Sequence, residues 1–303
     1  MAWNGRAVVT VAWLGICLTP AVTAREQPSS IEHSNADHQG QSLEANWANF
    51  WDHHLGEWNG RWTRYSPSGS VLETFASSRK FSSDPEHQQI TQENRYRFPN
   101  GNVNQKKWIY TKQEHNTING FAHPASAKMR GFAFNNGAAA WLIPKLDKDE
   151  FAYFELFLKR GDVRHSVGIV YDRNGQLMRT ASIREFRGAS IASPWSSNIQ
   201  QIKKWSPNGD WVGAQQKVNG NLNYSLIPAV QWSWGDLEES LHYLPDNIIL
   251  KCPDNISIGK SFEIEVVWQS SPTTIQIINS NYNKNAELIG IHHSMFRPKS
   301  SLE

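Results

Sequence analysis

The chain has 303 residues, 39% of them hydrophobic, and a mean hydropathy of −0.57, so it can form a packed core and is not expected to be disordered as a whole. Its 30 basic and 28 acidic residues are interspersed, and without a concentrated basic face nucleic acid is not an expected partner. The 14 tryptophans suggest aromatic-lined interiors, although a single tryptophan is more often an ordinary core residue.

Residues 1–24 have the layout of a secretory signal peptide, with Arg6, an apolar run, a helix-breaking proline and a "VTA" cleavage sequence ending at Ala24. The run is too short and interrupted for a membrane span. We therefore expect a secreted or periplasmic protein with no stable membrane span after cleavage; if this segment is not a signal, the protein is cytoplasmic. Cleavage would leave Cys252 as the only cysteine and exclude an intramolecular disulfide.

Residues 25–41 are polar and aperiodic and predict a flexible leader. A short helix is predicted to begin at Ser42, a good N-cap residue, and to end at Gly56. Its apolar positions recur at helical spacing and are Trp47, Phe50, Trp51 and His54 or Leu55. A helix with this face needs an apolar surface to pack on.

From Trp58 to Arg187, segments of alternating polarity are separated by turn sequences such as "PSG", "NNG" and "DRNG". The pattern predicts about eight strands joined mostly by short hairpins, which is typical of an up-and-down antiparallel barrel. A sandwich stays open, because pattern alone does not show closure.

The second half of the chain repeats the first. The segment "GEWNG" at 56–60 corresponds to "GDWVG" at 209–213, and "YDRNGQL" at 171–177 corresponds to "YNKNAEL" at 282–288. Self-similarity of this kind indicates tandem structural units.

The two copies differ in length. The leading glycines are offset by 153 residues (209 − 56), whereas the later strands that begin at Phe151 and Phe262 are offset by 111 (262 − 151). The second copy is therefore shorter by 42 residues (153 − 111), lost from its middle. We expect one unit over 42–190 and a second over 191–300.

A Gly-x-Trp at the first strand after a plugging helix resembles the lipocalin signature. With "WANFWDHHLGEWNGRWTRYSPSG", "SSRKF", "YDRNGQLMRTASIREFR" and "LPDNIILKCP", it makes residues 42–298 similar to the DUF3598 family, a cyanobacterial family of unknown function in the lipocalin-like (calycin) superfamily. The resemblance implies an all-β fold of two tandem lipocalin-like antiparallel β-barrels. The short N-terminal helix would plug the first barrel, and the second barrel would be shorter.

In this superfamily the tryptophan packs across the closed end of the barrel beside a late arginine. The matching residues, to which the resemblance gives this structural role, are Gly56, Trp58 and Arg184 or Arg187 in the first copy, and Gly209, Trp211 and Arg297 in the second. Calycins usually bind small hydrophobic molecules, and their relatives include phycobilin lyases and a few enzymes that cyclise or isomerise a ligand. The resemblance thus implies a fold and a ligand-binding habit rather than one activity. An export signal would set this chain apart from a cytosolic lyase.

Motifs for metal, nucleophile and cofactor chemistry are missing from the sequence. It has no cysteine pair and no HExxH, and the neighbouring His292 and His293 would point to opposite faces of a strand. It also has no Gly-x-Ser-x-Gly, phosphate loop or dinucleotide fingerprint. We expect no metal and no cofactor.

Candidate catalytic residues are polar groups on the inward faces of barrel strands. Glu155 and Arg164 lie on two strands joined by a tight turn and could come close, whereas Arg184 and Glu185 alternate, so only one of them can point inward. The candidates are Glu155, Arg164 and Arg184. Such a pair could hold a carboxylate, polarise a carbonyl or move a proton during cyclisation. The alternative is an ion pair on the outer face, or the structural arginine over the tryptophan.

Aromatic side chains on the same strands are the candidate cavity walls. They are Trp62, Trp108, Tyr110, Trp141, Tyr153 and Phe157. The second copy has fewer inward charges, so the ligand is expected in the first unit or between the two. The function expected is binding of a small, mostly hydrophobic molecule such as a pigment, terpenoid or acyl compound. The alternatives are a cofactor-independent cyclase or isomerase and a non-catalytic structural or interaction module.

Overall fold

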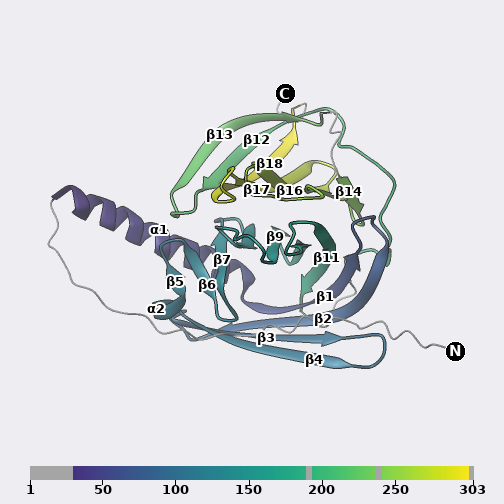
Figure 1. Ribbon diagram of the computed structural model, residues 1–303, viewed down its shortest axis with the longest axis horizontal. Coiled ribbons are helices and arrows are strands. Elements are labelled where there is room, and N and C mark those ends of the chain that lie inside the picture. The colour runs from purple at the N-terminus through teal and green to yellow at the C-terminus, as the bar shows by residue number, and fades with distance from the viewer. Residues whose placement is uncertain (1–29, 189–192, 236–240, 300–303) are drawn as a thin grey trace.

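The computed structural model describes residues 30–188, 193–235 and 241–299, and the predicted signal peptide at 1–24 lies outside them. Two antiparallel sheets make up most of the molecule, and one long helix approaches the first sheet from the side (Figure 1). In the described residues no helix combines the length and the apolarity needed to cross a bilayer.

The first sheet has eleven strands. They are β1 (Gly56–Tyr65), β2 (Val71–Ser83), β3 (Gln89–Arg97), β4 (Val103–Thr111), β5 (Asn116–Thr117), β6 (Gly120–His123), β7 (Ser126–Ala133), β8 (Ala139–Leu142), β9 (Ala152–Arg160), β10 (Val163–Tyr171) and β11 (Leu177–Arg187). Strands adjacent in the chain pair with each other, and β11 returns to pair with β1. The edge strands β4 and β5 are joined through the short helix α2 (Lys112–His115). The predicted up-and-down barrel is confirmed as a nearly closed one.

The second sheet has seven strands. They are β12 (Asp210–Val218), β13 (Tyr224–Ser233), β14 (Leu241–Leu244), β15 (Ile248–Lys251), β16 (Phe262–Ser271), β17 (Thr274–Tyr282) and β18 (Leu288–Pro298). Their order, β13-β12-β18-β17-β16-β15-β14, reproduces the segment β2-β1-β11-β10-β9-β8-β7 of the first sheet. The predicted repeat is therefore confirmed at the level of topology.

The expectation of a second barrel is wrong, because this unit is an open sheet. Between β2 and β7 the first unit places the strands β3 to β6, whereas β13 ends at Ser233 and β14 begins at Leu241. The few residues between them are too short for four strands. The 42-residue difference thus removes the strands that nearly close the first unit into a barrel.

The helix α1 (Ser30–His54) begins twelve residues before the expected start, so residues 30–41, predicted as part of a flexible leader, are helical. Its predicted apolar face is confirmed, since Trp47, Phe50, Trp51 and His54 are all buried. Trp51 contacts Tyr110 edge-on and Phe121 at a tilt of 45°, with ring centroids 5.0 and 5.6 Å apart. The helix therefore plugs one end of the barrel, as the resemblance implied.

The two sheets pack against each other through reciprocal contacts. Tyr171 Oη donates to the Pro253 carbonyl at 2.9 Å, and Tyr282, its counterpart in the repeat, donates to the Ile143 carbonyl at 2.8 Å. Because each unit presents the same tyrosine to the same loop of the other, the contact has the self-complementary form of a two-fold interface.

Backbone hydrogen bonds repeat the same reciprocity. The Leu177 amide donates to the Asp254 carbonyl at 2.8 Å, and the equivalent Leu288 amide donates to the Pro144 carbonyl at 2.7 Å. One continuous apolar core includes residues from both sheets. The units are therefore repeats in topology that share one core.

Candidate functional site

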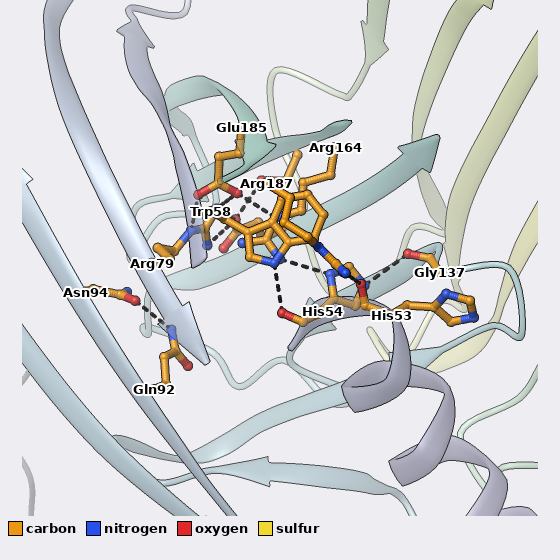
Figure 2. Close-up of polar contacts among 12 residues, drawn as sticks. His53, His54, Trp58, Arg79, Gln92, Asn94, Gly137, Arg164, Glu185 and Arg187 are labelled. Atoms are coloured by element: carbon orange, nitrogen blue, oxygen red, sulfur yellow. Dashed lines mark hydrogen bonds and ion pairs between the residues drawn. The ribbon is translucent and has the colours of Figure 1, made fainter. Parts of the chain in front are cut away.

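A cluster of charged and polar side chains lies inside the first barrel, beside the helix that plugs it. Strand register places five of its members on the inward faces of β2, β9, β10 and β11, and the sixth is the last residue of α1. We call the following residues the interior cluster: His54, Arg79, Glu155, Arg164, Ser166 and Glu185. Figure 2 shows several of them converging between the strands and the end of α1.

Glu185 is the centre of the interior cluster. Arg79 holds its carboxylate with two hydrogen bonds, Nε to Oε1 at 2.5 Å and Nη2 to Oε2 at 2.8 Å, and Arg164 Nε donates to Oε2 at 2.6 Å. Burial raises the pKa of Glu185, but Arg164 and Arg79 outweigh it and hold the pKa below the ordinary value. Glu185 is therefore an ionised anchor rather than a proton donor at neutral pH.

Glu155 is the accessible carboxylate of the cluster. Ser166 Oγ donates to its Oε1 at 2.8 Å, and Arg79 Nη1 lies 3.3 Å from the same oxygen. Its side chain is 19% exposed, against 0% for Glu185. With two arginines and two glutamates, the cluster is electrically neutral and keeps one carboxylate within reach of solvent.

His54 links the cluster to the helix. Arg164 Nη1 lies 2.9 Å from His54 Nδ1, and His54 Nε2 lies 3.0 Å from the Gly137 carbonyl. Because a guanidinium only donates, Nδ1 must accept, and the ring proton is on Nε2. Burial and then Arg164 lower the pKa of His54 well below its ordinary value, so the ring is neutral.

The resemblance gave Trp58 a structural role at the closed end, and the structure places it there. Its ring lies under two guanidinium groups, with the Cζ of Arg164 4.3 Å and that of Arg187 4.8 Å from the centroid. Trp58 Nε1 donates to the His54 carbonyl at 2.8 Å, and Arg187 donates to the His53 carbonyl at 3.0 Å. These bonds satisfy two carbonyls in the last turn of α1 that have no hydrogen-bond partner within the helix.

A row of hydrogen bonds follows the inward face of β3. Tyr110 Oη donates to Gln92 Oε1 at 2.8 Å, Gln92 Nε2 donates to Asn94 Oδ1 at 3.1 Å, and Asn94 Nδ2 donates to Tyr96 Oη at 2.8 Å. Every bond runs in the same direction. The hydrogen of the Tyr96 hydroxyl is left over at the end of the row.

The predicted ligand-lining residues all lie on the inward side of the barrel. Tyr110, Trp141 and Phe157 are buried against the plugging helix and its neighbours, and Phe157 lies beside Arg79 and Arg164. The other three are only partly buried and are Trp62, Trp108 and Tyr153. The structure thus places all six aromatic candidates on the inward side of the barrel, with Phe157 and Trp62 beside the arginines of the cluster.

Two of the three predicted catalytic residues belong to the interior cluster, and Arg184 does not. It points to the outer face of β11, where Nη1 lies 2.6 Å from Asp246 Oδ2 and Nη2 donates to the Asn198 carbonyl at 2.7 Å. Of the neighbouring pair, Glu185 is the residue that points inward. The expected approach of Glu155 to Arg164 is indirect, since Arg164 binds Glu185 and Glu155 binds Arg79.

Arg79 and His54 were missed as members of the cluster. Arg79 alternates with Phe75 and Phe81, and this spacing could have placed it on the buried face of its strand. His54 was recognised only as part of the apolar face of the helix. Its bond to Arg164 joins residues 110 positions apart, which no local pattern shows.

The second unit offers an internal comparison, since strand registers match its residues to those of the cluster. Arg164 and Glu185 pair across β10 and β11, and the equivalent pair in β17 and β18 is Ile275 and Phe296. Arg79 faces Trp58, and in the same way Trp232 faces Trp211. Trp232 stacks on Phe296 with centroids 5.7 Å apart. The second unit thus fills these positions with apolar side chains.

The arginine expected beside Trp211 is not there. Pro298 faces Trp211 across β12 and β18, where Arg187 faces Trp58 in the first unit, and Arg297 lies exposed on the opposite face. Glu265, the counterpart of Glu155, has no arginine in place of Arg79. Burial and then Glu263 raise the pKa of Glu265 to about 7.

Metal binding receives no support from the described residues, which contain no group of three or more His, Cys, Asp or Glu side chains able to hold an ion. Cys252 is buried, and burial raises the pKa of its thiol to about 12. A thiol in this state is a core residue rather than a nucleophile.

Comparison with known proteins gives a family and a fold. Residues 43–190 match the model of the N-terminal domain of DUF3598, a domain of unknown function. A DUF3598-family protein of unknown function from Nostoc punctiforme superposes with a TM-score of 0.64 at 15% identity, over 84% of this chain and 98% of that chain. At this identity the likeness concerns the fold alone. No curated protein matches the chain.

Two further structures are similar only in part. An S-type phycobiliprotein lyase from Guillardia theta superposes with a TM-score of 0.34 at 12% identity, over 50% of this chain and 98% of that chain. Kievitone hydratase from Nectria haematococca gives a TM-score of 0.22 at 8% identity, over 85% and 92% of the two chains. Both superpositions are too weak to bear on function.

Proposed function

We propose that the first barrel of this chain, a member of the DUF3598 family of unknown function, binds a small, mostly hydrophobic ligand between its aromatic walls. The proposal rests on the side chains in the interior of the barrel. A pigment, a terpenoid or an acyl compound would fit this description. We also propose that this binding takes place outside the cytoplasm, on the basis of the signal-like sequence of residues 1–24.

The contrast between the two units carries this proposal. A buried ion-pair network is often no more stable than well-packed apolar residues of similar volume. The second unit builds the same strands with Ile275, Phe296 and Trp232, so the topology does not require charges at these positions. The first unit has charged side chains at these positions, in the interior of a nearly closed barrel. A polar contact to a bound ligand would explain why charged residues occur there.

Partial exposure of inward side chains supports the same view. Trp62 and Tyr153 face the barrel interior and are only half-buried, and Glu155 is 19% exposed. Two small residues, Gly168 and Ala181, lie on the same face. A Cβ added at Gly168 would contact only Ala181, at 3.6 Å, and Ile183, at 4.0 Å. An apolar ligand here would cover ring surface that otherwise contacts water.

Binding fits the cluster better than proton transfer does. A general acid at neutral pH needs a carboxyl group with a raised pKa, and the two arginines hold Glu185 ionised. The cyclase or isomerase alternative depends on Glu155, the one accessible carboxylate. Chemical conversion of a bound ligand that is lost in Glu155→Gln would favour the enzyme.

Purification of the protein from its native host, followed by native mass spectrometry and absorbance, tests the proposal. Gly168→Leu places a bulky side chain in the barrel without backbone strain, and Asn279→Leu makes the same change at the equivalent position of the open sheet. We expect the ligand to co-purify with the wild type and Asn279→Leu, and its occupancy to fall about tenfold in Gly168→Leu. Equal occupancy in all three folded proteins would contradict binding in the first barrel.

A further inference from the structure

We infer that the ligand presents an uncharged carbonyl oxygen to one wall of the first barrel, where several hydrogen-bond donors have no acceptor among the described residues. This inference rests on the proposed function and adds the chemical group that the barrel recognises. The donors come from four strands and are Trp62 Nε1, Ser77 Oγ, Tyr96 Oη and Arg164 Nη2. We call them the donor wall.

Strand register brings the donor wall together. Arg164 faces Glu185, Glu185 faces Gly60, Gly60 faces Ser77, and Ser77 faces Tyr96, so one row crosses five adjacent strands. Gly60 is required in this row because a Cβ there would lie 2.1 Å from the Arg184 carbonyl oxygen.

Trp62 lies beside this row, one inward position along β1 from Gly60. Its ring meets that of Tyr96 edge-on, with centroids 5.8 Å apart, and the Arg79 guanidinium lies 5.4 Å from the Trp62 centroid. Trp62 and Tyr96 therefore border one region of the interior, and Ser77 faces Tyr96 in the neighbouring strand. Arg164 lies at the helix end of the row, with its guanidinium over Trp58.

Three of these donors have no partner among the residues that the structure describes. The atoms are Trp62 Nε1, Ser77 Oγ and Arg164 Nη2, and each is buried. Leaving a buried donor unpaired costs about 1–3 kcal/mol, so groups of this kind are normally satisfied by water or by a ligand. Three of them along one wall indicate a missing acceptor rather than three separate defects.

The row along β3 supplies the fourth donor. Tyr96 already accepts from Asn94 Nδ2, so its own hydroxyl hydrogen is available, and no acceptor for it occurs in the described part of the chain. Since Tyr110, Gln92 and Asn94 all donate in the same direction, they hold the Tyr96 oxygen as an acceptor on one side and a donor on the other.

The second unit has other residues at the positions that correspond to three of these donors. The counterparts of Ser77 and Arg164 are Val230 and Ile275, which carry no side-chain donor. The counterpart of Trp62 is Gln215, and its Nε2 donates to Ser294 Oγ at 3.1 Å. The same strands can therefore be built without unpaired donors at these three positions.

Charge and shape define the acceptor further. The interior cluster is already neutral, so a carboxylate would add an uncompensated charge to a buried region, whereas a carbonyl oxygen would not. Trp62 stacks on Phe75 with centroids 5.7 Å apart and an angle of 18° between the rings, which provides a flat aromatic surface beside the donors. A planar, conjugated carbonyl compound satisfies both conditions.

A matched series of planar probes tests the inference on the full-length protein. Fluorene, fluoren-9-one and fluorene-9-carboxylate share one ring system and differ only in the group at one carbon. Dissociation constants come from quenching of tryptophan fluorescence. We expect fluorenone to bind about thirtyfold more tightly than fluorene, because two donors of about 1 kcal/mol each gain an acceptor, and the carboxylate to bind most weakly.

Variants that each remove one hydroxyl of the donor wall test whether this wall causes the preference for fluorenone over fluorene. Tyr96→Phe and Ser77→Ala should each reduce the ratio of fluorenone to fluorene affinity about threefold to fivefold, with fluorene affinity unchanged. Tyr65→Phe, which removes a hydroxyl bonded to the Ile199 carbonyl on the outer face of β1, serves as the control and should keep the wild-type ratio.

The outcomes separate the two proposals. Equal binding of fluorene and fluorenone, or tightest binding of the carboxylate, would overturn the carbonyl inference while leaving ligand binding in place. A preference for fluorenone that survives both donor variants would also overturn it. No binding of any of the three probes would contradict the proposed function itself.

Discussion

Arg184 and Glu185 are consecutive residues of β11 that serve opposite sides of the molecule. Glu185 accepts hydrogen bonds from Arg79 and Arg164 inside the first barrel, whereas Arg184 lies 2.6 Å from Asp246 of the second unit. One strand therefore carries the interior cluster on one face and the contact between the units on the other. The following predictions concern each of these faces.

Glu185→Gln should destabilise the protein by about 3–5 kcal/mol, because it leaves two buried guanidinium groups without their counter-charge. Denaturant unfolding followed by circular dichroism measures the change. Glu93→Gln is the control, since Glu93 pairs with Lys107 at the surface with both side chains about half exposed. Its cost should stay below about 1 kcal/mol. A cost for Glu185→Gln as small as for Glu93→Gln would refute the anchoring role.

Replacing the whole charged core of the cluster should cost less than breaking it. In the triple variant Arg79→Met, Arg164→Met and Glu185→Leu, no buried guanidinium is left alone, and the remaining Glu155 is partly exposed and keeps its hydrogen bond from Ser166, so the core imitates the apolar second unit. We expect it to be more stable than Glu185→Gln in the same unfolding experiment. It should nevertheless lose the preference for a carbonyl probe. A triple variant less stable than the single one would mean that the ions themselves hold the barrel together.

Acid should destabilise the protein through its buried histidines. Burial, and for His165 also the nearby Arg184, lowers the pKa of His165 and of His293 to about 3. Between pH 3 and about 6.5 the unfolded chain binds more protons at these rings than the folded one, so stability falls as pH falls through this window. His165→Asn should reduce the slope of unfolding free energy against pH, between pH 4.5 and 6, by about one proton. An unchanged slope would show that this ring is protonated in the folded protein.

Glu265 should act in the opposite direction. Its pKa of about 7 lies above the value of an unfolded glutamate, so its ionisation costs stability as pH rises towards 7 and above. Glu265→Gln should therefore stabilise the protein at pH 8 relative to the wild type and lose this advantage at pH 5. Thermal unfolding at the two pH values measures it. Destabilisation at pH 8 would show that Glu265 is favourably solvated or paired.

The reciprocal tyrosines should contribute equally. Tyr171→Phe and Tyr282→Phe each remove one hydroxyl bond to a carbonyl of the other unit, at 2.9 and 2.8 Å, and each should cost about 1 kcal/mol. Because the sites are separate, the costs should add in the double variant. Unfolding should remain a single transition, since one core spans both sheets. Two separate transitions would show that the units fold independently.

The features that sequence could predict are those written in local periodicity. Alternation predicted the strands and which residues share a face. The repeated turn sequences predicted two units, which the matching registers Tyr171 with Leu177 and Tyr282 with Leu288 confirm. The helix face was predicted because its four apolar positions recur at helical spacing. Its beginning was not, since residues 30–41 carry no apolar periodicity that marks a helix.

Closure and pairing could not be predicted in the same way. An open sheet and a barrel share one strand pattern and differ in whether the edge strands meet, which depends on segments far apart in the chain. The partner of Arg164 could not be predicted either, because Glu155 and Glu185 lie on the two strands that flank it. The three-dimensional position of Arg79 decides that Glu185 binds both arginines. The choice between Arg184 and Glu185 required knowledge of which face of β11 is inside.

The reciprocity between the units has an evolutionary consequence. Each tyrosine bond joins the end of one long strand to the loop that follows β8 or β15, and the strands missing from the second unit take no part in it. A single ancestral unit would have carried both halves of the contact and could have formed a homodimer before gene duplication joined two copies. After fusion, one copy was free to lose its closing strands while still covering the other. A tandem fusion of two first units should then assemble through the same surfaces and enclose two interiors.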